Sequence, residues 1–270
     1  MQIKEIKIND LITVSKLPSA DFVINPYVGC SNACKYCYAS FMKRFTNHSE
    51  PWGEFIDVKI CDKPLNTKKL IGKSVFLASV TDVYNDFEKE YRCTRKILEQ
   101  LVGLDINLSI STKNDLILRD IDLLKQMKNL TVSFSINTTN EQFKNDMDKA
   151  SSIEKRINAL KVLNDNSIKT VCFISPIFPE ITDWKEIITH TKNFVHEYWF
   201  ENLNLRGSYK KTILDYIEEK YPKLTPLYNE IFNKGKKHYW QNLAIEINDY
   251  CRDNKVKFIN YFYHEQIKKK

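Results

Sequence analysis

Short apolar runs rich in β-branched and aromatic residues alternate with longer stretches of helical period along most of the chain. Each run is a predicted strand, and together they cover Phe22–Val28, Ser74–Ser79, Ile106–Ser111, Leu130–Ile136, Thr170–Ser175 and Tyr198–Asn204. Two of the intervening stretches place their apolar residues on one helix face, namely Ile153, Ile157, Leu160 and Leu163, and Ile117, Ile121, Leu124 and Met127. This alternation predicts an α/β fold with parallel strands. Six such units curl into a partial barrel or lie open as a doubly wound sheet, and the pattern alone fits both.

The chain of 270 residues is long enough for one large domain or two small ones. The segment NLRGSYKK closes the alternating region, and the pattern after it is mainly helical. We therefore predict a main domain over residues 1–205 and a basic, mainly helical C-terminal extension over residues 206–270. Within the extension one stripe of residues is expected to pack against the main domain, and it consists of Trp240, Leu243, Ile247 and Tyr250.

Charge and hydropathy limit the kinds of partner and the cellular location that this chain can have. The net charge is +7, and residues 201–270 carry 14 Lys and Arg against 9 Asp and Glu. A basic excess of this kind fits a polyanion partner such as nucleic acid, or simply a solvated lysine-rich surface and tail (IKKK). No stretch reaches the roughly 18 consecutive apolar residues of a membrane span, and the start MQIKEIKIND has no apolar signal segment. We expect a cytoplasmic protein that does not enter a membrane.

Three cysteines, Cys30, Cys34 and Cys37, share one short loop after the first predicted strand. The chain has seven cysteines, an odd number, and the others are isolated, which is no disulfide framework. A structural zinc site needs four ligands, and the nearest histidine is His48. An iron-sulfur cube held by three thiolates instead leaves one iron open for a ligand from outside the protein. The loop therefore predicts chemistry on a bound molecule.

The pattern Cys-x3-Cys-x-aromatic-Cys, here with Tyr36 as the aromatic residue, resembles the radical S-adenosylmethionine (SAM) superfamily. The resemblance implies a 4Fe-4S cluster on Cys30, Cys34 and Cys37, with the methionine part of SAM on the open iron. Reductive cleavage of SAM would then yield a 5'-deoxyadenosyl radical that abstracts hydrogen from a substrate. The superfamily fold, a partial (β/α)6 TIM-type barrel, matches the six predicted strands, and we adopt it with a helical C-terminal extension.

Further blocks resemble the spore photoproduct lyase-like group, also described as DNA repair photolyase-like, over roughly residues 20–205. They include SVTDVYNDFEKEYRCTRKILEQL, ISTKNDLILRDIDLL, VSFSINTT, RINALKVLND and SPIFPEITD. The group implies SAM contacts for six residues, namely Tyr38 at the adenine, Thr81 and Asp82 at the methionine ammonium, Lys113 at the carboxylate or ribose, Ser135 at the ribose and Arg156 at the carboxylate. Plainer roles are also open, since Tyr38 suits a core tyrosine, Asp82 a helix cap, Lys113 a solvent-facing lysine and Arg156 an ordinary ion pair. Ser133 points to the same face as Ser135 and is the alternative at the ribose.

The chain departs from true spore photoproduct lyases after the second strand. Those enzymes have a cysteine there that returns hydrogen to the repaired thymine, whereas the corresponding stretch here is LASVTD. Cys93 lies a further helical stretch away. Thymine-dimer repair is therefore not expected, and a shared fold cannot restore it.

We accordingly expect a radical SAM enzyme, supplied with electrons by a flavodoxin or ferredoxin-type reductant. Its substrate is unidentified. Nucleic acid is the first candidate, because the extension interleaves aromatic and basic residues, and peptides and small molecules come next. The interleaved residues are Tyr209, Lys210, Lys211, Lys236, Lys237, His238, Tyr239 and Trp240. The alternatives are a zinc-binding interaction module completed by His48 and a plain iron-sulfur electron carrier.

Overall fold

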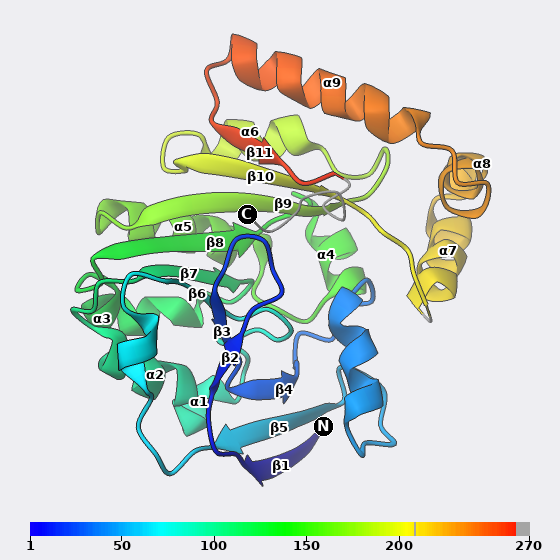
Figure 1. The fold of residues 1–270 in the computed structure, drawn as a ribbon. Coiled ribbons are helices and arrows are strands. Elements are labelled where there is room, and N and C mark those ends of the chain that lie inside the picture. Colours follow the sequence, from blue (N-terminus) through cyan, green and yellow to red (C-terminus); the bar gives the residue numbers. More distant parts are fainter. Residues whose placement is uncertain (208, 263–270) are drawn as a thin grey trace.

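The structure, a computed structural model, describes residues 1–207 and 209–262. Its main sheet has eight strands in the order β11-β10-β9-β8-β7-β6-β3-β2 (Figure 1). Six of these, parallel and adjacent in chain order, are the predicted ones: β3 (Phe22–Ile24), β6 (Ser74–Leu77), β7 (Asn107–Thr112), β8 (Asn129–Ser135), β9 (Lys169–Ile177) and β10 (Glu197–Asn202). A doubly wound sheet would reverse its order at a switch point. The unbroken order confirms the partial barrel.

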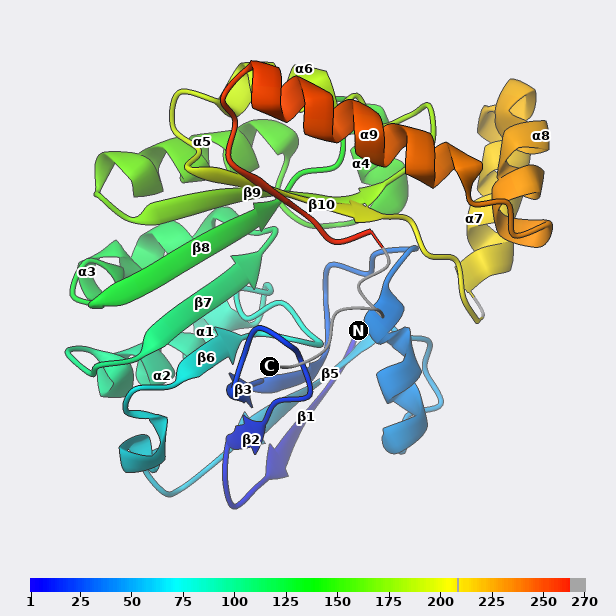
Figure 2. The ribbon, with the colours of Figure 1, turned by 45° about the horizontal axis from the view of Figure 1, so that its top comes forward.

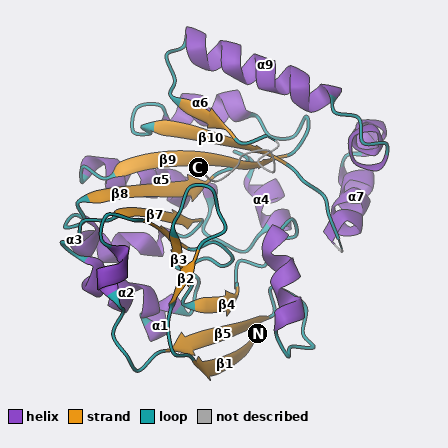
Figure 3. Cartoon of the chain, viewed as in Figure 1, coloured by secondary structure: helices purple, strands orange, loops and turns teal. Residues whose placement is uncertain are grey.

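The barrel is open because its two outermost strands do not pair with each other. On one side β2 (Ile12–Val14) is antiparallel to β3, and on the other β11 (Phe258–Asn260) is parallel to β10. Helices lie along one side of the curved sheet (Figures 2 and 3), which leaves the other side concave. Those in the barrel part are α1 (Glu88–Tyr91), α2 (Cys93–Leu101), α3 (Ile121–Leu124), α4 (Glu141–Met147), α5 (Ile153–Asp165) and α6 (Trp184–Thr191).

The helix predicted around Ile153 is α5, which begins at the expected residue and is capped by the Ser152 side chain. The predicted stripe from Ile117 to Met127 is not one helix. A 3₁₀ helix (Asp115–Asp120) precedes α3, and the buried carboxylate of Asp120 at the junction accepts hydrogen bonds from arginine side chains. These hydrogen bonds hold the junction between two short helices, where the sequence predicted one continuous α-helix.

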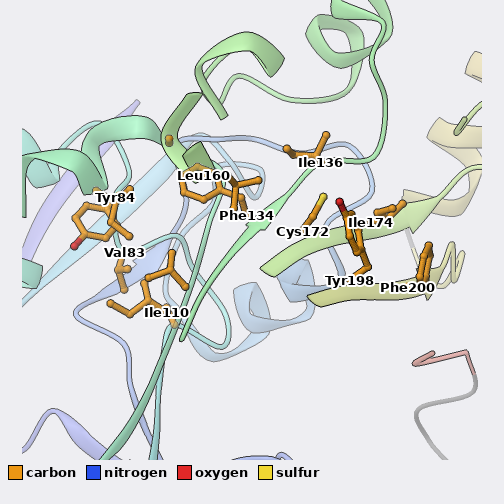
Figure 4. Packing of buried hydrophobic residues seen from close by; sticks show 14 of the residues in the cluster. Val83, Tyr84, Ile110, Phe134, Ile136, Leu160, Cys172, Ile174, Tyr198 and Phe200 are labelled. Carbon is orange, nitrogen blue, oxygen red and sulfur yellow. The ribbon is translucent and has the colours of Figure 1, made fainter. Parts of the chain in front are cut away.

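One large hydrophobic cluster fills the space between the sheet and its helices. Figure 4 shows part of it, with Phe134 and Leu160 together, and with Cys172 and Tyr198 on neighbouring strands. Cys172 and Cys251 are both fully buried in this cluster. They therefore serve as small apolar core residues, as isolated cysteines in a reducing setting usually do.

A second sheet lies beneath the cysteine loop and was not predicted. It has the order β1-β5-β4, with β1 (Gln2–Lys7) parallel and β4 (Tyr27–Gly29) antiparallel to β5 (Phe55–Ile60). The predicted strand Phe22–Val28 is thus two strands in two different sheets. The break falls at Asn25–Pro26, where proline has no N–H to donate to a ladder.

The C-terminal extension contains α7 (Tyr209–Lys220), a 3₁₀ turn (Pro222–Leu224), α8 (Thr225–Tyr228), a π-helical turn (Asn229–Asn233) and α9 (His238–Asp253). The stripe on α9 packs against the main domain as predicted, since Trp240, Leu243 and Ile247 are buried in the large cluster. After α9 the chain returns to the sheet as β11, an addition that the sequence did not predict. The boundary near Arg206 stays a prediction, and the IKKK tail lies outside the described residues.

None of the helices in the described ranges is long and apolar enough to cross a bilayer.

Candidate functional site

The three cysteines lie in a tight loop directly after β4. Gly29 ends β4 with a φ of +85°, and a Cβ there would come within 2.3 Å of the Phe55 carbonyl oxygen. Only glycine lets the chain pass β5 so closely and turn into Cys30. Cys30 is buried, Cys34 and Cys37 are partly buried, and a 3₁₀ helix, η1 (Tyr38–Phe45), begins directly after Cys37.

Burial and a nearby cation act in opposite directions on the thiols. Burial raises the pKa of all three thiols, and in Cys30 the neighbouring Asp82 and Cys37 raise the pKa further. The Lys113 ammonium acts in the opposite direction on the pKa of Cys34 and Cys37, so it lies near both thiols. Buried thiols of this kind become thiolates when a cationic metal centre replaces their protons.

The three thiols could hold either a single metal ion or an iron-sulfur cluster. Within residues 1–207 and 209–262, no three His, Cys, Asp or Glu side chains are grouped so as to hold one metal ion. An iron-sulfur cube makes a different demand, because each thiolate binds its own iron. The three thiols are close enough to affect each other's pKa, as Cys30 and Cys37 do for Cys34. Three soft sulfur donors on one loop beside a cation fit a cluster with three protein ligands.

His48, the suggested fourth ligand of a zinc site, is already engaged elsewhere. Its Nε2 lies 2.8 Å from an Asp57 carboxylate oxygen and its Nδ1 lies 3.1 Å from Glu50. The ring stacks on Phe55 at a centroid distance of 3.9 Å. Both ring nitrogens therefore help to attach the loop that follows η1 to strand β5. This geometry disfavours a zinc site completed by His48.

Asp82 ties the cysteine loop to the carboxyl ends of β6 and β7. Its Oδ1 accepts hydrogen bonds from the Tyr84 N–H at 2.9 Å and the Thr112 hydroxyl at 2.7 Å. Its Oδ2 accepts from the Asn32 amide at 2.9 Å, the Lys113 N–H at 2.9 Å and the Asn114 amide at 3.1 Å. With five donors on one buried carboxylate, this geometry favours a positioning role for Asp82.

Asp82 is thus one anchor of the cysteine loop, and a second anchor, formed by the hydrogen bonds to Asp148, holds the other end of that loop. The Tyr36 hydroxyl, between Cys34 and Cys37, donates to Asp148 at 3.1 Å. Arg156 is fully buried and donates to the other Asp148 oxygen at 2.6 Å and to the Ser135 carbonyl at 3.1 Å. Arg156 thus supports the loop from α5 through Asp148, and a direct contact of Arg156 with SAM stays a prediction.

The remaining predicted residues surround the loop at the strand ends. The Thr81 hydroxyl donates to the Gly29 carbonyl at 2.6 Å. The Lys113 ammonium lies 5.8 Å from the Tyr36 ring centroid. Tyr38 is 61% exposed, and its hydroxyl donates to the Ser79 carbonyl. Ser135 is buried at the end of β8. All four lie at the carboxyl end of the barrel or on the cysteine loop, where ligands of such folds collect.

The concave side of the sheet carries polar and aromatic residues that sequence reasoning missed. Because Cys172 and Tyr198 point to the helices, their strand neighbours Phe173 and Trp199 point to the concave side. Their rings meet at a centroid distance of 5.8 Å, and the Tyr261 ring lies 5.8 Å from Trp199 and 6.4 Å from Phe173. The apolar runs of β9 and β10 do not mark them in the sequence, and only the period of two residues in a strand separates them from the residues that face the helices.

Two further polar residues share this side near the carboxyl ends of β9 and β10. The Ser175 hydroxyl donates to Glu201 at 2.5 Å. The Glu201 carboxylate is close enough to Tyr38 and Tyr209 to raise the pKa of both phenols, behind the larger effect of burial. The concave aromatic cluster therefore ends in a carboxylate that faces the cysteine loop.

Known proteins are similar to this chain in sequence. The Radical SAM superfamily matches residues 24–190 of the chain. This chain belongs to the radical SAM superfamily. Membership implies SAM and, in most members, a 4Fe-4S cluster. An uncharacterized protein of Methanocaldococcus jannaschii is 42% identical over 223 residues, which cover 82% of this chain and 85% of that protein. An uncharacterized protein of Mycobacterium tuberculosis is 22% identical over 245 residues, which cover 82% of this chain and 72% of that protein.

Solved radical SAM structures share the fold. Spore photoproduct lyase complexed with dinucleoside spore photoproduct matches with a TM-score of 0.60 at 20% identity, covering 82% of this chain and 66% of that one. Streptococcus suis SuiB bound to S-adenosylmethionine matches with a TM-score of 0.58 at 17% identity, covering 88% of this chain and 49% of that one. The chain thus spans about two thirds of the lyase and about half of SuiB. These matches confirm the spore photoproduct lyase-like fold.

Cys93 does not fill the place of the cysteine that the lyases have after their second strand. It opens α2 and packs in the small cluster beneath the cysteine loop with Tyr27, Ile56 and Val58. The stretch after β6 that corresponds to the lyase position contains Ala78 and Ser79. The observed packing of Cys93 therefore gives no support to thymine-dimer repair.

Proposed function

We propose that this chain is an enzyme that binds a 4Fe-4S cluster through Cys30, Cys34 and Cys37 and reductively cleaves SAM. When bound, the cluster and SAM together supply a 5'-deoxyadenosyl radical that abstracts hydrogen from a substrate. The observation that carries the proposal is the buried three-thiol loop at the carboxyl end of a partial barrel, held by two hydrogen-bonded anchors.

The residues around the loop have distinct parts in this proposal. Lys113, the cation beside Cys34 and Cys37, suits the SAM carboxylate, since an ammonium group attracts an anion in surroundings of low polarity. The exposed ring of Tyr38 offers an aromatic face for adenine. Ser135 offers a hydroxyl at the end of β8 for the ribose. Asp82 and Arg156 keep the loop in position.

We propose that the substrate binds on the concave side, against Phe173, Trp199 and Tyr261. Aromatic rings stack on nucleobases, which supports nucleic acid as the first candidate, with peptides and small molecules next. The basic extension contributes less than its sequence suggested. Trp240 is buried, and Lys236 is paired with Glu230.

The test is anaerobic reconstitution with iron and sulfide, followed by dithionite, SAM and detection of 5'-deoxyadenosine. We expect the parent protein to form the product and Cys34→Ala to lose both iron and product. Cys61→Ala is the matched control, since Cys61 lies outside the loop at the end of β5. Zinc without sulfide would favour the interaction module. A cluster that leaves SAM uncleaved would favour the electron carrier.

A further inference from the structure

The 3₁₀ helix η1 presents an unusual surface directly after Cys37. Phe41 is 44% exposed and Phe45 is 66% exposed. The Arg44 guanidinium lies 5.5 Å from the Phe41 ring centroid and 4.7 Å from that of Phe45. Of the nine exposed large hydrophobic side chains in the described ranges, three belong to these eight residues of η1. Exposed apolar side chains gathered in this way mark an interaction surface.

The charged side chains of the segment that carries this surface are all basic, and the first carboxylate after it, Glu50, pairs with His48. Residues 30–49 include Lys35, Lys43 and Arg44 but no Asp or Glu. Lys35 and Arg44 are exposed, and Lys43 is partly exposed. Aromatic residues, including phenylalanine, and arginine are enriched in protein interfaces. An apolar centre with a positive rim therefore fits an acidic protein.

The position of η1 indicates what such a partner would do. A 3₁₀ helix rises about 2 Å per residue, which puts Phe41 roughly 8 Å and Phe45 roughly 16 Å along the axis from Cys37. In Figure 2 the helix is the blue coil at the surface near α7. A protein seated on Phe41 and Phe45 would come close to the cysteine loop, and electron transfer depends steeply on such closeness.

We propose that Phe41, Arg44 and Phe45, the η1 patch, form the docking site for an acidic one-electron donor protein of the flavodoxin or ferredoxin type. In the step that docking permits, the reduced donor loses one electron and the cluster gains it. No bond or proton changes at the patch. This inference rests on the proposed function, because it requires a cluster that accepts an electron.

The test compares two reductants on the same reconstituted protein. Dithionite is small and needs no docking site, whereas a reduced flavodoxin does. The first variant is Phe41→Ser with Phe45→Ser, and the second is Arg44→Glu. Control variants are Val14→Ser and Ile245→Ser, which remove exposed apolar side chains elsewhere. The readouts are the rate of cluster reduction, followed by absorbance, and flavodoxin affinity, measured by calorimetry.

We expect both η1 variants to be reduced by dithionite at the parental rate and by flavodoxin at least roughly tenfold more slowly, with affinity weakened to match. The flavodoxin rate of the parent should also fall with added salt. Unchanged flavodoxin rates and affinities would overturn the inference. Equal losses with both reductants would do so as well, since they would mean damage to the cluster.

Two further outcomes are distinguishable. If the variants lose affinity for a single-stranded oligonucleotide but keep the parental flavodoxin rate, the η1 patch binds nucleic acid and the inference is wrong. If the parent forms no cluster, the proposed function fails, but flavodoxin affinity still tests the surface. Parental binding that both η1 variants lose would then support docking, and equal binding would refute it.

Discussion

The carboxylate of Asp82 allows a quantitative test of the site's architecture. The substitution Asp82→Asn keeps the shape of the side chain and replaces one acceptor oxygen with a donor N–H group. Oδ1 accepts two hydrogen bonds and Oδ2 accepts three, so the new amide nitrogen fits best in the Oδ1 position. There the Thr112 hydroxyl can reverse its role, but the buried Tyr84 N–H loses its acceptor.

The expected loss of folding free energy in Asp82→Asn has two parts. An unsatisfied buried donor costs about 1–3 kcal/mol, and the three donors that remain on oxygen lose a charged partner, at roughly 0.5–1 kcal/mol each. We therefore expect a loss of about 2.5–6 kcal/mol, which lowers the melting temperature by roughly 4–11 °C in a chain of this size. Asn32, one of the three, lies between Cys30 and Cys34, so bound iron per chain should fall too.

Thermal unfolding by circular dichroism and iron analysis after reconstitution provide the measurements. Asp105→Asn is the control, because Asp105 is exposed and the substitution is chemically the same. The control should stay within about 1 °C of the parent. If Asp82→Asn melts with the control and retains full iron, Asp82 does not hold the loop and the reasoning is wrong.

Three other predictions concern the second anchor and the extension. Arg156→Met removes the closer of two cations from buried Asp148 and leaves the Lys144 ammonium 3.6 Å away, so it should cost at most about 3–5 kcal/mol, read from denaturant unfolding; parental stability would contradict this anchor. The pKa of Glu230 is lowered to about 2, first by its hydrogen bonds to two lysines. Because folding lowers this pKa, the ion pairs should survive as the pH falls below 4.5 and break near pH 2, and carboxyl titration by NMR near the ordinary value would refute them. A chain ending at residue 206 lacks the buried Trp240 and the rest of α9 and β11, so it should aggregate; a soluble product with cooperative unfolding would contradict this packing.

The expected aggregation of the truncated chain affects how nucleic acid binding can be tested. Heparin retention by a truncated chain would mix lost charge with lost folding, since β11 pairs with β10 in the main sheet. Charge substitutions at exposed lysines avoid the problem. Lys211, for example, is exposed and pairs only across one helix turn with Asp215.

The fold could be predicted from the sequence to the extent that apolar runs identify buried strands. The six apolar runs correspond to the six parallel strands, because each combines β-branched or aromatic residues with at least one buried side. In the small sheet, β5 does alternate Ile56, Val58 and Ile60 with polar residues, but nothing in that pattern indicates a second sheet, and β11 left only a weak signal. The run Phe22–Val28 does not reveal that its two halves enter different sheets, and β11 has only three residues, whose pairing with β10 depends on the packing of α9.

The three cysteines of the site could be predicted from the sequence, but the residues that hold their loop in place could not. The spacing of Cys30, Cys34 and Cys37 is local, and its chemistry follows from the residue type. Asn32 and Thr112, which anchor Asp82, lie 50 and 30 residues away along the chain. Arg156 reaches the cysteine loop through Asp148, which is 112 residues from Tyr36. Residue type alone could not separate a SAM contact from a buried support, because a carboxylate or guanidinium suits both.

The central claim is a cluster held at three corners, with its remaining iron open to SAM. Electron paramagnetic resonance of the anaerobically reconstituted, reduced protein tests it most directly. We expect the signal of a reduced 4Fe-4S cluster whose g values shift when SAM is added, and loss of that signal in Cys34→Ala. A cluster signal that SAM leaves unchanged, or an equal signal in Cys34→Ala, would contradict it.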